Sequence, residues 1–83
     1  MHSVEEEKEL NNTYNFILQK IIKLRIAAGY TQIDIADFVG LTESGYFKLE
    51  KGKTKLDTER LLLILYKLKI SPKDFFKDID INL

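Results

Sequence analysis

Two glycines, each followed two residues later by a threonine, divide the middle of this chain into short segments. The pairs are Gly29 with Thr31 and Gly40 with Thr42. Glycine readily adopts the left-handed conformation that follows many helices, and a threonine hydroxyl accepts a hydrogen bond from a free amide of the next helix. The pattern therefore predicts a helix ending at Gly29, a short helix between Thr31 and Gly40, and a third that starts at Thr42.

Apolar residues recur in these segments at the three- and four-residue spacing of a helix face. In the first helix the apolar positions are Tyr14, Ile17, Ile21, Leu24 and Ala28. The inner positions predicted for the next two helices are Ile35, Ala36, Val39, Tyr46 and Leu49. Asp34 is placed to complete a capping box with Thr31, and the third helix should run to about Lys51, where Gly52 ends it.

Two further helices are predicted after the polar loop that follows Gly52. Asp57 caps the fourth, and its apolar stripe consists of Leu61, Ile64, Leu65 and Leu68. Ser71 and Pro72 read as a cap followed by proline at the first helical position, with Phe75 and Phe76 as anchors of a fifth helix. We therefore expect an all-α fold of five helices.

The ends of the chain leave alternatives open. The first helix begins either at Ser3, which forms a capping-box pattern with Glu6, or at Asn11 or Asn12. Residues 1–12 are accordingly an acidic extension of that helix or a flexible arm, and residues 13–77 form the folded domain. The tail, residues 78–83, alternates polar and apolar side chains, so it is an extended arm that pairs with a partner or is frayed, and we favour fraying.

Composition excludes several classes of site. The 83 residues contain no cysteine and a single histidine, His2, so we expect no disulfide, no metal site and no other cofactor. Ser44 lacks a candidate base and no glycine-rich phosphate loop is present, so we do not expect an enzyme. No segment resembles a signal peptide or a membrane span, which favours a cytoplasmic protein.

The charge of the chain gives evidence both for and against nucleic-acid binding. The 13 basic and 13 acidic residues balance, whereas proteins that neutralise phosphates usually carry a basic excess. The distribution is uneven, however, because four lysines against one glutamate give +3 between residues 48 and 55. A locally basic face on a neutral protein can still attract DNA.

Two short capped helices joined by a glycine-containing turn are the outline of a helix-turn-helix, whose second helix enters the major groove of DNA. The segments that carry the pattern run from Gly29-Tyr30-Thr31-Gln32 through Val39-Gly40-Leu41-Thr42 to Lys48-Leu49-Glu50-Lys51-Gly52-Lys53-Thr54-Lys55. With the apolar positions of the fourth helix and Ser71 to Phe76, they resemble the lambda-repressor-like family, also called Cro/C1-type or XRE. The resemblance covers residues 21–76 without a gap.

The resemblance implies a sequence-specific regulator of transcription, by family habit a repressor, that binds double-stranded DNA as a homodimer in a bacterium or phage. It implies that Gln32 hydrogen-bonds a phosphate and that helix 42–51 is the recognition helix. The residues it places at base edges are Thr42, Glu43, Ser44, Phe47 and Lys48. Those it places at the DNA backbone are Lys51, Lys53 and Lys55. It also implies a structural ion pair between Arg25 and Glu50.

Three residues of the recognition helix depart from the family pattern. Glu43 is a carboxylate near phosphates, so it either accepts a hydrogen bond from a cytosine amino group or simply stabilises the first helical turn. Gly45 lets the backbone approach DNA or reflects only the absence of a side chain. We expect Phe47 to be exposed, where it can touch a thymine methyl group, because Tyr46 and Leu49 occupy the inward positions.

Zero net charge, Glu43 and Phe47 also support a competing hypothesis, a protein-interaction module or antitoxin-type partner on the same fold. DNA binding that weakens steeply with salt would favour the first hypothesis, and salt-insensitive binding to a protein would favour the second. Leu63 and Tyr66 add apolar surface to the fourth helix, which is a weak indication of a dimer seam.

Overall fold

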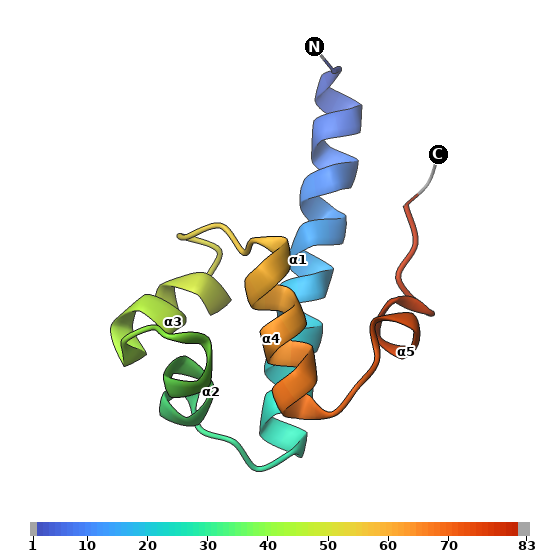
Figure 1. Ribbon diagram of the computed structural model, residues 1–83. Helices are drawn as coiled ribbons and strands as arrows, with labels where there is room; N and C mark the ends of the chain where they lie inside the picture. The colour runs from blue at the N-terminus through green and yellow to red at the C-terminus, as the bar shows by residue number, and fades with distance from the viewer. Residues whose placement is uncertain (1, 82–83) are drawn as a thin grey trace.

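The computed structural model describes residues 2–81 and shows an all-α fold, as the sequence predicts. Its helices are α1 (Val4–Ala27), α2 (Gln32–Val39), α3 (Glu43–Glu50), α4 (Thr58–Leu68) and α5 (Pro72–Phe76). Helices α2 and α3 pack against each other on one flank of α1 and α4, and α5 lies on the other side of α4 (Figure 1). The fold thus leaves α3 at the edge of the molecule.

The start of α1 is decided in favour of Ser3. Its hydroxyl accepts a hydrogen bond from the Glu6 amide at 3.1 Å, and the Glu6 carboxylate accepts one from the Ser3 amide at 2.7 Å. The acidic residues after Ser3 are therefore helical, and this half of α1 extends beyond the other helices (Figure 1). At the other end α1 stops at Ala27, two residues before the predicted Gly29, and Ala28 is exposed rather than on the inner face.

Threonine caps both short helices. Thr31 forms the predicted capping box with Asp34, and the Thr42 hydroxyl accepts a hydrogen bond from the Gly45 amide at 3.0 Å. The recognition helix predicted over 42–51 is one residue shorter at each end, because Thr42 and Lys51 are its caps. A capping residue keeps a non-helical backbone or ends the hydrogen-bond ladder, so it does not count as helix.

The core draws side chains from all five helices. Every predicted inner residue of α2 and α3 is at most 5% exposed. The core residues are Ile21, Ile35, Ala36, Val39, Tyr46, Leu49, Ile64, Leu65 and Phe75. Leu63, predicted to add surface, is half-buried against this core, whereas Phe76, predicted to be an anchor, is 38% exposed. Only one of the two adjacent phenylalanines can face inward from a helix as short as α5.

The expectation of a frayed tail is wrong for its first residues. The Lys20 amine of α1 donates to the Phe75 carbonyl at 2.6 Å and pairs with the Asp78 carboxylate. Ile79 is half-buried against the core. These contacts dock the segment after α5 onto α1, while residues 82 and 83 of the predicted tail lie outside the described residues.

A lysine occupies the left-handed position that ends α4. Lys69 has a φ of 59°, and no other non-glycine residue among 2–81 has a positive φ. A side chain costs free energy in this conformation, so Lys69→Gly is expected to raise the free energy of unfolding by about 0.5–1 kcal/mol. Urea denaturation of dilute protein measures this. The control Lys67→Gly, inside α4, should lower the free energy of unfolding by about 1 kcal/mol. If both variants lower it, Lys69 is not strained in its left-handed conformation.

Candidate nucleic-acid interface

The outer face of α3 is formed by residues at helical spacing. Glu43, Ser44, Phe47 and Lys48 are all exposed, while Tyr46, Leu49 and Glu50 on the opposite face are buried. Residues three and four apart share a helix face, so the four exposed side chains form one surface. Thr42 borders this surface. Its hydroxyl oxygen accepts a hydrogen bond from the Gly45 amide, and the hydroxyl proton is still available to donate.

The segment from the end of α3 into the loop is more basic on the surface than the sequence count suggests. Lys48, Lys51, Lys53 and Lys55 are exposed, whereas Glu50, at 4% exposure, is withdrawn into the core. No exposed acid therefore offsets these lysines between residues 48 and 55. None of the four has an ion-pair partner among residues 2–81, and Lys51 lies over the Phe47 ring at 5.5 Å.

The loop that carries two of these lysines is held at both ends. The Lys53 amide donates to the Lys48 carbonyl at 2.9 Å, which folds the chain back after Gly52. The Leu56 amide donates to the Tyr14 hydroxyl of α1, also at 2.9 Å. A loop with fixed ends presents its lysines with less ordering entropy to lose on binding.

A buried ion pair ties α3 to α1. Arg25 Nε donates to Glu50 Oε2 at 2.7 Å and Arg25 Nη2 donates to Glu50 Oε1 at 3.2 Å. The third guanidinium nitrogen, Nη1, donates to the Tyr30 carbonyl at 3.0 Å in the turn before α2. The arginine therefore fixes the position of both short helices relative to α1.

Gln32 joins the same cluster. Its side-chain Nε2 donates to Glu50 Oε1 at 3.0 Å, so the first residue of α2 is linked to the last residue of α3. An amide nitrogen has two protons, and this bond uses one of them. The other stays available next to the N-terminus of α2, where the helix dipole favours an anion.

The groups around Glu50 lower the pKa of its carboxyl more than its burial raises it. Burial alone would raise the pKa of this carboxyl, but Arg25, Tyr46 and Gln32 favour the ionised form, and the net effect lowers the pKa below 4.5. The Tyr46 hydroxyl is buried beside the pair without a hydrogen bond of good geometry, and burial raises its pKa. The centre of the helix pair thus holds a charge that is compensated internally.

Comparison with known proteins decides what this arrangement is. A family model described as Helix-turn-helix matches residues 21–75, which span α2, α3 and α4. The chain belongs to the Cro/C1-type (XRE) helix-turn-helix family. It is therefore a helix-turn-helix DNA-binding domain, and the family is not one of enzymes.

One curated relative is similar to part of this helix-turn-helix domain. It is the SPbeta prophage-derived uncharacterized HTH-type transcriptional regulator YonR of Bacillus subtilis (strain 168), 42% identical over 43 residues. The match covers 52% of this chain and 40% of the relative, so the chain aligns with less than half of that protein. No solved structure matches the domain. Within residues 2–81 no helix has the length and apolarity needed to cross a bilayer.

Three residues of α3 depart from the family pattern, and the structure of the helix-turn-helix domain shows the environment of each. A Cβ atom on Gly45 would lie 3.2 Å from the Thr42 hydroxyl oxygen, so the glycine leaves room for the cap of its own helix. Phe47 is 42% exposed on the outer face. Glu43 occupies the first turn of α3, where the helix dipole favours its charge.

Sequence reasoning missed three contributors to the site: the Gln32–Glu50 bond, the bond from Arg25 to the Tyr30 carbonyl, and the contact of Tyr14 with the lysine loop. Gln32 and Glu50 are 18 positions apart, and Tyr14 and Leu56 are 42 apart. No local spacing relates residues at such separations. Tyr14 occupies a position that the sequence predicts for the inner helix face, and a hydroxyl on that face is a signal that the residue needs a polar partner.

Proposed function

We propose that this helix-turn-helix domain is a sequence-specific regulator of transcription that binds double-stranded DNA as a homodimer and represses its target. Helix α3 lies in the major groove, and the residues that contact base edges are Thr42, Glu43, Ser44, Phe47 and Lys48. The residues that contact the phosphates of the DNA backbone are Gln32, Lys51, Lys53 and Lys55. The proposal fits the relative's description as a transcriptional regulator and its prophage origin, which favour a bacterial or phage protein acting in the cytoplasm.

The outer face of α3 is the main support for this proposal. Four exposed side chains share one helix face, three more exposed lysines follow at the end of α3, and a buried cluster fixes the helix to α1 and α2. None of the lysines between residues 48 and 55 has an ion-pair partner among residues 2–81. A recognition helix that is rigid before binding loses little entropy in the complex. Phosphate contacts then set its register while base contacts specify sequence.

Selection of the purified protein on random-sequence duplex DNA, followed by affinities across a salt series, tests the function. Enrichment of a site with two-fold symmetry and an affinity that falls with salt is the expected result. A folded protein that enriches no sequence at low salt would overturn the proposal. It would favour the protein-interaction module, for which the neutral net charge and the exposure of Phe47 are the support.

Single lysine variants test the division of roles. Lys48→Ala is expected to weaken binding to the selected site and to relax the preference at one base pair by about 1–3 kcal/mol. Lys53→Ala should weaken binding to all sequences by a similar factor and reduce the salt slope by about 1. Competition binding against a panel of single-base variants measures both. Uniform losses in both variants would show that Lys48 reads no base.

A further inference from the structure

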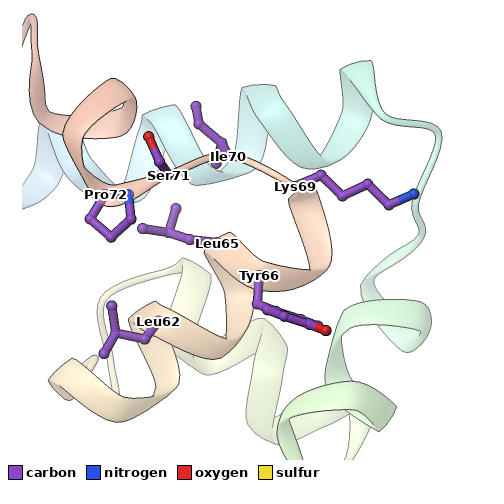
Figure 2. A pocket seen from close by; sticks show the side chains of 7 residues that line it. All are labelled: Leu62, Leu65, Tyr66, Lys69, Ile70, Ser71 and Pro72. Carbon is purple, nitrogen blue, oxygen red and sulfur yellow. The ribbon is translucent and has the colours of Figure 1, made fainter.

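The outward face of α4 carries an apolar patch that the core does not use. Leu62 and Tyr66, one helical turn apart, are 48% and 76% exposed. Beside them lies an open hollow of about 510 Å³, and Ile70 and Pro72 form its far wall (Figure 2). Large side chains grouped around a hollow commonly mark a contact surface in a soluble domain.

Tyr66 is held in place although it is exposed. Its ring stacks on Phe38 of α2, with centroids 6.0 Å apart and planes 6° from parallel. The Lys67 amine lies over Phe38 at 5.4 Å on the same aromatic cluster. An exposed aromatic ring that is already ordered makes an effective interface anchor, because binding costs it little entropy.

Charges flank this apolar pair in a self-complementary order. On the outward face of α4, Glu59 lies three positions before Leu62. Lys69, the C-cap residue directly after α4, lies three positions after Tyr66 and lines the hollow. Both charged residues are exposed, and neither has an ion-pair partner among residues 2–81. Lys69 also keeps its side chain in a left-handed position that glycine would occupy without strain.

The positions of these four residues in the sequence are symmetric about Ile64 of α4. Leu62 and Tyr66 lie two positions either side of Ile64, and Glu59 and Lys69 lie five positions either side. Antiparallel pairing with a second α4 about a two-fold axis would therefore place Leu62 against Tyr66 of the other copy, and Glu59 against Lys69. An unrelated partner would have no reason to match this internal symmetry, whereas a two-fold interface must be self-complementary.

We infer that the seam formed by Glu59, Leu62, Tyr66 and Lys69 is the homodimer interface of this protein, with antiparallel α4 helices. The inference names the partner surface of the homodimer in the proposed function, and it can be tested without DNA. A seam of one short helix with its flanks buries less than a large obligate interface does. Pairing in free solution is therefore weak, and two adjacent half-sites on DNA reinforce it by raising the effective concentration.

Charge reversal with mixing provides a test that misfolding cannot imitate. In the Glu59→Lys homodimer, both contacts between positions 59 and 69 join two lysines. In the Lys69→Glu homodimer, both contacts join two glutamates. Each variant alone is expected to dimerise at least about tenfold more weakly than the natural protein. In an equimolar mixture both contacts become Lys–Glu pairs, so a 1:1 heterodimer of about natural affinity should form. Sedimentation velocity at low salt and near-millimolar protein measures all four samples.

Lys23→Glu on α1 makes the same charge change as Lys69→Glu outside the seam and should leave dimerisation within about threefold of the natural protein. The inference is overturned if the natural protein is monomeric at near-millimolar concentration, or if the mixture pairs no better than its components. Natural protein that pairs through the seam but selects no DNA would remove the proposed function alone. Natural protein that selects a two-fold-symmetric DNA site, while the mixed charge variants pair no better than either variant alone, would remove this inference and leave the proposed function.

Discussion

Glu50→Ala is expected to lower the free energy of unfolding by about 3–5 kcal/mol, because it leaves Arg25 charged and buried without its partner. The glutamate side chain accepts three hydrogen bonds, two from Arg25 and one from Gln32. A domain of this size has a total stability on the order of 4–12 kcal/mol, so the variant is expected to be close to unfolding. Urea denaturation followed by circular dichroism measures the change.

The matched control is Glu43→Ala, which removes the same residue type from the exposed end of the same helix. It should change stability by less than about 1 kcal/mol. The double variant Arg25→Met with Glu50→Met keeps the volume but removes both charges, so it should recover most of the loss. A Glu50→Ala protein as stable as the control would show that the ion pair does not hold the helices together.

The pH dependence of stability checks the same ion pair. The pKa of Glu50 is lowered in the folded state, so its contribution is complete above the unfolded value near 4.5 and is lost as the pH falls through the folded pKa. Hydrogen bonds at Ser3 and Thr31 and the contact with Lys20 similarly lower the pKa values of the exposed carboxyls Glu6, Asp34 and Asp78. Glu50→Gln should therefore flatten the acid limb only in part.

Replacing the three proposed backbone lysines together is expected to reduce DNA affinity about 10²-fold at roughly 0.15 M salt, whatever the DNA sequence. The variant is Lys51→Gln with Lys53→Gln and Lys55→Gln. Each lysine that neutralises a phosphate contributes about 0.9 to the slope of log affinity against log salt, so the slope should fall by about 2.7. Fluorescence anisotropy with the selected site and with an unrelated duplex, at four salt concentrations, measures both quantities.

Three exposed lysines away from α3 provide a control with the same change in net charge. They are Lys8, Lys23 and Lys77, and their replacement by glutamine should leave the salt slope almost unchanged, because distant exposed charges are screened. Equal slope changes in the two triple variants would mean that only net charge matters. An unchanged slope in the first variant would show that its lysines do not neutralise phosphates.

The secondary structure was predictable because each helix boundary depends on a few adjacent residues. Ser3, Thr31, Thr42, Asp57 and Ser71 each accept the predicted hydrogen bond at a helix start. The errors were small shifts at helix ends, and the sequence left the start of α1 open between Ser3 and Asn11 or Asn12. Both starting points satisfy local capping chemistry, so neighbouring residues alone gave no basis for choosing.

The surface charge of the candidate site was harder to predict. The sequence count of +3 between residues 48 and 55 includes Glu50, which the fold withdraws into a buried pair with Arg25. Family resemblance implied that pair, but nothing local indicated the bond from Gln32 or the contact between Tyr14 and the lysine loop. The proposed roles of the residues on α3 and its loop remain predictions for the DNA experiments.

The sequence by itself determined the helices, their order, most of the inward-facing residues and the helix-turn-helix pattern, because capping and apolar periodicity act within one or two turns. Tertiary structure alone decided that Glu50 is internal while four lysines remain on the surface, and that Gln32 joins the Arg25 cluster. It also showed that Leu62 and Tyr66 remain exposed on α4. These outcomes depend on how five helices share one core, and burial and pairing between distant residues have no local signature.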